Sequence, residues 1–193
     1  MSEKKHLHKH GGKSSQELLD AKRALTSIKV AQGDVFMDAG CGDGFIAMEA
    51  SKMVGESGKV LAVDRYSPSL DTLRQNVEER KIENLQVVEA DLTKRLPLED
   101  ATVDTCLMAN VLHGFIYNDE MNGVVHELKR ILKSDGRLAI VEFKKMEGTP
   151  GPNVSERITA EDVKLALKKW GINSIDEMEV GPYHYVVVLV KDE

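Results

Sequence analysis

Several features that mark secreted, membrane-spanning or thiol-dependent proteins are scarce in this sequence. Only two cysteines occur, Cys41 and Cys106, and their spacing suits neither a metal site nor a disulfide. No apolar run is long enough to cross a bilayer, and the polar first residues lack the apolar region of a signal peptide. We therefore expect a cytoplasmic protein without a membrane span, in which both cysteines are reduced packing residues.

The chain also lacks an excess of positive charge. The chain has 26 Lys and Arg residues against 32 Asp and Glu residues, and the basic ones are spread along it. Its formal net charge is −6. Binding of a phosphate backbone needs basic residues gathered on one surface. We therefore expect a small-molecule partner and no nucleic acid, and no feature indicates an oligomeric state.

The length of 193 residues suits one domain with one sizeable core, and no repeat or linker divides the chain. We expect this domain over residues 14–193, preceded by a mobile tail over residues 1–13. The tail carries His6, His8 and His10 at alternate positions. Metal binding is an alternative for them, but no further ligand stands at a fixed spacing, so we expect no metal.

One stretch organises the rest of the chain. A short apolar run, residues 35–37, ends in Asp38 and leads into residues 40–44, where every second residue is glycine. A helical apolar pattern follows over residues 45–50. Glycine lets the backbone turn sharply and lets a ligand approach it, and the first N–H groups of the next helix point at that ligand. The pattern predicts a loop that binds a nucleotide-type cofactor.

The kind of cofactor follows from the neighbouring acids. Asp64 ends a second expected strand, near the roughly 20-residue step at which a strand-end carboxylate meets ribose hydroxyls. A dinucleotide site needs a further glycine where Phe45 stands, and Asp38 and Asp43 would repel a diphosphate. The acids favour a ligand that carries positive charge.

Together these motifs, Asp38 to Gly44 with Val63-Asp64, resemble the first two motifs of the class I S-adenosylmethionine-dependent methyltransferases. The likeness covers roughly residues 15 to 190 and is closest to the small-molecule, quinone-biosynthesis branch known as methyltransferase type 11. It implies S-adenosylmethionine as the cofactor and S-adenosylhomocysteine as its product. The residues that it places at the cofactor are Asp38, Gly40, Cys41, Gly42, Gly44, Asp64, Arg65, Asp91, Leu92 and Asn110. For Asp91, a role in capping a turn is the alternative.

The resemblance also implies a Rossmann-like, doubly wound α/β sheet of seven strands in the order 3-2-1-4-5-7-6, with the last strand antiparallel and helices on both faces. Periodicity predicts the elements. Further strands are expected at residues 59–63, 85–90, 103–109 and 137–143, and a closing hairpin at residues 175–180 and 183–190. Helices are expected at residues 15–29, 67–81, 119–132 and 159–170, with turns or loops at residues 134–136 and 146–158.

Two titratable residues are candidates for catalysis. His113 follows the fourth expected strand on the same loop as Asn110, and we expect it to face the substrate. Its unperturbed pKa lies near neutrality, so it suits a base for an acceptor that must lose a proton. Glu142 falls at the carboxyl end of the fifth strand, where open α/β sheets bind ligands, and desolvation would have to raise its pKa.

Two further residues are expected on the substrate side. Arg157 ends the proline-rich loop and could bind an anionic group, with a pair that stabilises the fold as an equal alternative. Tyr183 in the hairpin is either a substrate platform or ordinary sheet packing.

The expected reaction is in-line displacement of the cofactor's methyl group by an O, N, C or S atom of an unidentified acceptor. A methyltransferase acting on RNA or protein is one alternative, although it would need a basic groove. A protein that binds the cofactor without catalysis is another. The missing third glycine weighs against an NAD oxidoreductase, and the two cysteines are too few for arsenic methylation.

Overall fold

A computed structural model describes residues 16–192, so the predicted tail over residues 1–13 lies outside the described residues. The strands are β1 (Val35–Ala39), β2 (Lys59–Asp64), β3 (Leu85–Glu89), β4 (Val103–Ala109), β5 (Leu132–Phe143), β6 (Ile172–Val180) and β7 (His184–Lys191). The helices are α1 (Ala21–Ser27), α2 (Phe45–Val54), α3 (Ser67–Glu79), α4 (Leu112–Tyr117), α5 (Met121–Ile131) and α6 (Ala160–Lys168), with a short 3₁₀ turn, η1, at Val154–Glu156.

The strands form one sheet in the order β3-β2-β1-β4-β5-β7-β6, which confirms the predicted order. Strands β1 to β5 run parallel to one another, and β7 runs antiparallel to both β5 and β6. The chain therefore moves outward from β1 to β3 and returns to β4 on the other side of β1. Ligands in such sheets bind at the carboxyl ends of the strands where the order reverses, which here lies between β1 and β4.

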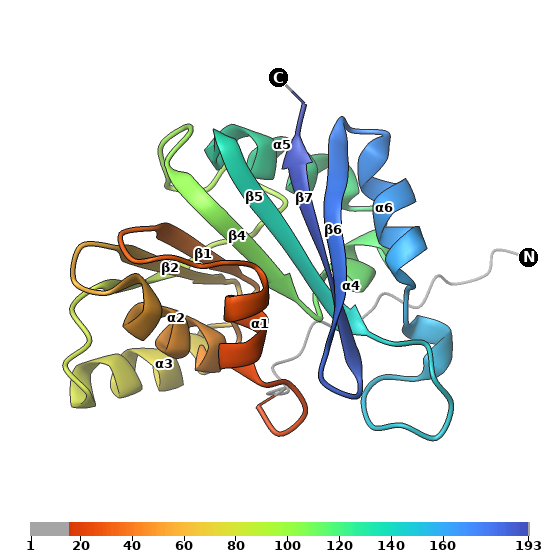
Figure 1. Cartoon of the computed structure of the whole chain (residues 1–193). Helices are drawn as coiled ribbons and strands as arrows, with labels where there is room; N and C mark the ends of the chain where they lie inside the picture. The colour runs from red at the N-terminus through yellow and green to blue at the C-terminus, as the bar shows by residue number, and fades with distance from the viewer. Residues whose placement is uncertain (1–15, 193) are drawn as a thin grey trace, which may run out of the picture.

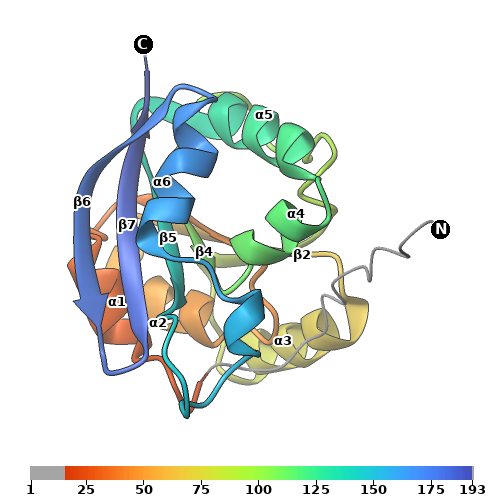
Figure 2. The ribbon, with the colours of Figure 1, turned by 90° about the vertical axis from the view of Figure 1, so that its right-hand side faces the viewer.

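Helices cover both faces of the sheet (Figures 1 and 2). α1, α2 and α3 lie on one face, and α4, α5 and α6 lie on the other. Consecutive strand residues alternate between these two cores: Phe36 and Leu107 pack on the first face, Met37 and Met108 on the second. The middle parts of the central strands are therefore mostly apolar, because both of their faces are buried.

The first helix begins later than predicted. α1 starts at Ala21 instead of residue 15, while residues 16–18 form a turn. Asp20 stands in front of the helix with an extended backbone, and its carboxylate accepts a hydrogen bond from the Arg23 N–H at 2.9 Å. An aspartate in this position is a strong N-cap, so it sets the start of the helix. Residue 15, where the predicted helix begins, lies outside the described residues.

Further differences from the prediction concern β5, β6 and α4. β5 begins at Leu132, and the expected turn at residues 134–136 is a bulge, because Leu132 pairs with Val103 while Arg137 already pairs with Thr105. β6 begins at Ile172 instead of residue 175. α4 was not predicted, because six residues are too few to show a helical period.

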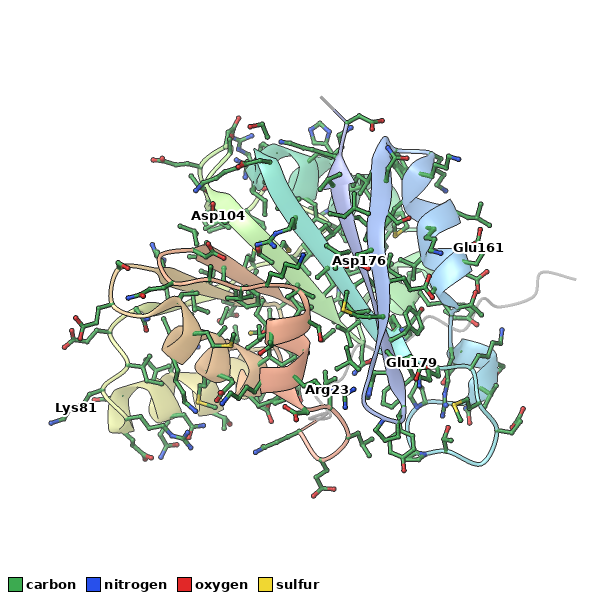
Figure 3. All side chains as sticks on the ribbon, viewed as in Figure 1. Arg23, Lys81, Asp104, Glu161, Asp176 and Glu179 are labelled. Carbon is green, nitrogen blue, oxygen red and sulfur yellow. The ribbon has the colours of Figure 1, made fainter. Side chains whose placement is uncertain are left out.

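The carboxyl ends of β4 and β5 point toward one edge of the sheet, and the loop after β5 and the turn between β6 and β7 extend beyond that edge (Figure 1). Asp104, near the start of β4, marks the opposite edge (Figure 3). There its carboxylate accepts from the Val35 N–H at 2.8 Å and pairs with Lys133 at 2.6 Å.

Among residues 16–192, no helix has the length and apolar character needed to cross a membrane.

Candidate functional site

The predicted cofactor turn, residues 40–44, is fixed to the end of β2. The N–H groups of Gly40 and Cys41 both donate to the Val63 carbonyl, at 2.7 and 3.1 Å. Gly40 has φ +82°, and a Cβ atom there would lie 2.7 Å from a methyl group of Val111. Gly42 has φ +53°, but a Cβ atom there would find no protein atom within 4 Å. One side of the turn is therefore packed, and its middle faces open space.

Asp64 lies directly against this turn. One of its carboxylate oxygens accepts from the Gly42 N–H at 2.9 Å, and the other accepts from the Tyr66 N–H at 2.9 Å. The structure thus brings together the glycine turn and the acid that were matched from sequence alone. Arg65, the next residue, is exposed, and its contact with a cofactor stays a prediction.

Asp38 ends β1 beneath the turn with only 2% of its surface exposed. Burial and the neighbouring charge of Asp64 raise the pKa of Asp38 to about 7, although a hydrogen bond from the Ala47 N–H opposes them. Among the described residues, its Oδ2 atom has no hydrogen-bond partner. A buried carboxyl group in this state would be stabilised by a cation or a hydrogen-bond donor.

Both cysteines are buried thiols. Burial raises the pKa of Cys41, and the charges of Asp38 and Asp64 raise it further. Burial raises the pKa of Cys106 as well. Neither thiol is therefore a nucleophile at neutral pH. Cys41 lies in the turn between Gly40 and Gly42, and its contact with a cofactor stays a prediction.

The end of β3 adjoins the same site. The Ala90 N–H donates to the Asp64 carbonyl at 2.9 Å. Asp91 accepts from the backbone N–H and the hydroxyl of Thr93 at 2.9 and 2.8 Å, so the turn-capping role left open by the sequence is present. Burial acts to raise the pKa of Asp91, but these two hydrogen bonds lower it. Leu92 is buried in the core, and contact of either residue with adenine stays a prediction.

Asn110 follows β4 beside the cofactor turn. It has φ +59°, a left-handed conformation that is uncommon outside glycine, and its N–H donates to the Val141 carbonyl at 2.8 Å. The next residue, Val111, is the one whose methyl groups approach Gly40. Asparagine adopts this conformation more readily than other residues with a side chain, so it suits the bend after β4.

His113 and Glu142 form a buried pair. His113 lies in α4, not in a loop as predicted, and its Nδ1 atom is 2.9 and 3.0 Å from the two carboxylate oxygens of Glu142. Glu142 also accepts from the His113 backbone N–H at 3.1 Å. The two side chains are 5% and 2% exposed.

The charge of Glu142 sets the state of the imidazole. Burial alone would lower the pKa of His113, but the hydrogen bond to Glu142 and its charge outweigh burial and raise it. Since an ionised carboxylate only accepts hydrogen bonds, Nδ1 carries a proton, and in the neutral ring the lone pair belongs to Nε2. The pair can therefore take up a proton at Nε2 and stabilise the resulting imidazolium.

Arg157 makes the fold-stabilising contacts that the sequence left as the alternative to binding a substrate anion. The side chain is 3% exposed, and its guanidinium donates to acceptors of its own loop. These acceptors are the carbonyls of Lys144, Met146, Thr149, Pro150 and Pro152 and the hydroxyl of Thr149. All five N–H donors are directed at the loop, so none is left for a substrate anion. Arg157 instead holds the loop after β5 in one shape.

This loop is also fixed to its neighbours. The Tyr117 hydroxyl, at the end of α4, donates to the Ser155 carbonyl, and the Tyr185 hydroxyl donates to the Ile158 carbonyl at 2.8 Å. Tyr183 lies in the hairpin turn, where its carbonyl accepts from the Lys144 N–H at 2.7 Å. Its contact with a substrate stays a prediction.

His184 is a residue that the sequence did not single out. It is 0% exposed at the start of β7, opposite Phe143 of β5, and its Nε2 atom is 3.4 Å from the side-chain nitrogen of Asn110. No local motif indicates it, because its partner stands 74 positions away.

Among residues 16–192, no cluster of three or more His, Cys, Asp or Glu side chains could hold a metal ion.

Comparison with known proteins places this site in a family. A family model described as a methyltransferase domain matches residues 31–180. The structure is similar to that of an S-adenosylmethionine-dependent methyltransferase from Aquifex aeolicus, with a TM-score of 0.83 and 33% identity over 92% of this chain and 93% of that one.

Curated relatives match more locally. The "Probable cobalt-precorrin-6B C(15)-methyltransferase (decarboxylating)" of Sulfurisphaera tokodaii is 27% identical over 61% of this chain and 57% of its own length. The ubiquinone/menaquinone biosynthesis C-methyltransferase of Pseudomonas putida is 32% identical over 60% of this chain and 44% of its own length. The chain thus spans about half the length of these relatives. The glycine turn, its partner acid, the strand order and the family match agree, and the chain belongs to the S-adenosylmethionine-dependent methyltransferases.

Proposed function

We propose that the protein transfers a methyl group from S-adenosylmethionine to a small-molecule acceptor that loses a proton from oxygen or carbon. The observation that carries this proposal is the buried His113–Glu142 pair, with 2.9 Å between imidazole and carboxylate, at the carboxyl edge of the sheet. His113 lies two residues after Val111, which contacts the cofactor turn at Gly40. A proton acceptor therefore stands close to the cofactor site.

The residues present fit the cofactor. The space in front of Gly42 admits a ligand against the backbone, and Asp64 offers carboxylate oxygens beside it for ribose hydroxyls. The unpartnered Oδ2 atom of Asp38 suits a ligand that carries positive charge, as a sulfonium with an ammonium group does. We therefore assign Gly40, Gly42, Asp38, Asp64 and the backbone around Asn110 to hold it.

When bound, S-adenosylmethionine supplies an electrophilic methyl group. The work of the chain is to orient the two reactants in line and to exclude water, which alone lowers the barrier substantially. The loop of residues 144–158, held by Arg157, lies over the carboxyl edge of the sheet and is suited to close the acceptor side.

Proton transfer is the step for which the chain provides a specific group. As the acceptor atom attacks, His113 takes its proton at Nε2 and becomes imidazolium, while Glu142 holds Nδ1–H and stabilises the positive charge. His113 acts only when it is neutral. Because Glu142 raises the pKa of His113, activity should increase with pH through this raised pKa.

The names of the relatives support such an acceptor. Two of them are named as C-methyltransferases, one of a precorrin and one of ubiquinone/menaquinone biosynthesis. Methylation of a carbon that bears hydrogen releases a proton, but the precorrin enzyme is named as decarboxylating, so the quinone enzyme is the one that supports a proton acceptor. A nucleic-acid substrate has little support, since the edge strand β6 exposes acidic side chains such as Asp176 and Glu179 (Figure 3). A cytoplasmic location and a single domain over residues 14–193 remain predictions from composition.

The test is methyl transfer from methyl-labelled S-adenosylmethionine to a panel of acceptors. The panel contains a phenol, a hydroquinone, a β-dicarbonyl compound, a primary amine and a thiol, with RNA and a protein mixture as further arms. We expect label on the oxygen or carbon acids, with kcat/KM rising with pH, and little on the amine. Transfer to the amine, RNA or protein alone, or cofactor binding without any transfer, would contradict the proposal.

A further inference from the structure

His184 is held rigidly at the start of β7. It pairs with Phe143 of β5 and with Val180 of β6 in the antiparallel ladders, and it has no solvent exposure. Its ring packs on the Phe143 ring with 4.1 Å between centroids and 42° between planes. Arg157 covers Phe143 in turn, with its guanidinium carbon 5.4 Å from the ring centroid. The imidazole therefore has little freedom to rotate.

The ring is neutral. Burial lowers the pKa of His184 to about 4, and the nearby charges of Arg157 and Lys144 act in the same direction. A neutral imidazole has one nitrogen that donates and one that accepts. Which nitrogen accepts is decided by the neighbour.

The neighbour is the side-chain amide of Asn110. Its nitrogen lies 3.4 Å from His184 Nε2, and an amide nitrogen only donates. With the amide nitrogen on this side, Nε2 is the acceptor and the proton of the neutral ring is on Nδ1, a buried atom that has no hydrogen-bond partner among the described residues. In this contact the amide nitrogen of Asn110 faces His184 of β7, so the Oδ1 atom on the other side of the amide faces away from β7.

Asn110 occupies the point where strand order reverses. It follows β4, which lies next to β1, has a left-handed conformation, and precedes Val111, which lies against the cofactor turn. We propose that His184 is a positioning residue, which orients the Asn110 amide through Nε2 so that its oxygen is presented to the amino-acid end of S-adenosylmethionine. The proposal rests on the cofactor site assigned above.

Three variants of His184 keep a polar atom near Nε2, near Nδ1 or at neither position. His184→Gln places an amide oxygen near the position of Nε2 and keeps an acceptor for Asn110. His184→Asn reaches only the position of Nδ1, and His184→Leu removes both polar atoms. We expect His184→Gln to bind S-adenosylhomocysteine within about threefold of wild type, and the other two to bind about tenfold more weakly, since a neutral hydrogen bond is involved. The KM for S-adenosylmethionine should follow, with kcat changed less.

A double-mutant cycle separates positioning from general packing. In an Asn110→Ala background, His184→Leu should cause little further loss of S-adenosylhomocysteine affinity, because the group that it orients is gone. Losses that simply add, or equal affinities for His184→Gln and His184→Asn, would overturn the proposal. Wild-type protein that fails to bind S-adenosylhomocysteine at all would instead overturn the cofactor site itself.

A measurement on wild-type protein covers the case in which the variants do not fold. Nitrogen-15 NMR of labelled histidine at neutral pH should show His184 as a neutral ring protonated on Nδ1. A ring protonated on Nε2 would mean that the imidazole donates to Asn110 and that the amide has the opposite orientation, which would contradict the proposal.

Discussion

The two halves of the sheet build their parts of the site in different ways. On the side of β1 and β2, the site consists of a glycine turn with its backbone N–H groups and of two carboxylates, Asp38 and Asp64, near the carboxyl ends of these strands. On the side of β4, β5 and β7, it consists of side chains that meet across the fold, His113 with Glu142 and Asn110 with His184. We assign the turn and its acids to the cofactor, together with Asn110 and His184, whereas we assign His113 and Glu142 to the proton of the acceptor.

The comparison predicts that the halves can be damaged separately. Changes in the turn should remove cofactor binding together with activity. Changes in the His113–Glu142 pair should remove activity and leave cofactor binding intact. The following variants test this separation, from the largest expected effect to the smallest.

His113→Gln should lower kcat by about 10² to 10⁴, the usual contribution of a positioned general base. Affinity for S-adenosylhomocysteine should stay within about threefold, as measured by calorimetry. His126→Gln, on the exposed side of α5, is the matched control and should leave both quantities unchanged. Equal loss of binding and kcat in His113→Gln would show that the two halves are not separable.

Gly42→Ala should weaken S-adenosylhomocysteine binding about 100-fold, because the new Cβ atom occupies the open space in front of the turn. Gly148→Ala is the control, since Gly148 also has a left-handed φ and an unobstructed Cβ position but lies in the exposed loop after β5. Both variants should lose about 1 to 2 kcal/mol of stability from the backbone conformation. If both lost the same amount of affinity, the space at Gly42 would not be the ligand site.

Asp38→Asn should make the ligand-free protein more stable, increasingly so at high pH. The pKa of Asp38 is about 7 in the folded state against an ordinary value of 3.8. This group therefore costs the wild-type protein no stability below about pH 4. As the pH rises from about 4 to about 7, the wild-type protein loses stability, because the unfolded state releases a proton that the folded state keeps. The stability gain of the variant should grow by about 2 kcal/mol between pH 5.5 and pH 8 in urea unfolding. A gain that does not change with pH would show that Asp38 has an ordinary pKa.

Cys41→Ala should have the smallest effect. The thiol is buried and its pKa is raised, so its contribution is packing next to the turn. We expect S-adenosylhomocysteine affinity within about threefold of wild type and slow reaction of folded wild-type protein with thiol reagents at pH 8. Rapid modification of Cys41, with loss of activity, would indicate a chemical role for the thiol.

The same division explains how far the sequence could be interpreted. The cofactor turn was predictable because the glycines at 40 and 42 act within a few residues of one another, and Asp64 ends the next strand. The strand order followed from the family resemblance that these motifs carry. Glu142 was located correctly at a strand end, but its contact with His113 joins residues 29 positions apart. The role of His184 and the folding of a loop around Arg157 depend on tertiary contacts that no periodicity records.

The most direct test of the account is the structure of the protein with S-adenosylhomocysteine bound. We expect its ribose on Asp64 and its sulfur facing His113, so placed that an acceptor atom could lie within about 3.5 Å of both the methyl position and His113 Nε2. A complex in which the ribose is on Asp64 but the sulfur faces away from His113 would contradict the proposed proton transfer. A ligand bound away from residues 40–44 would contradict the cofactor site as well.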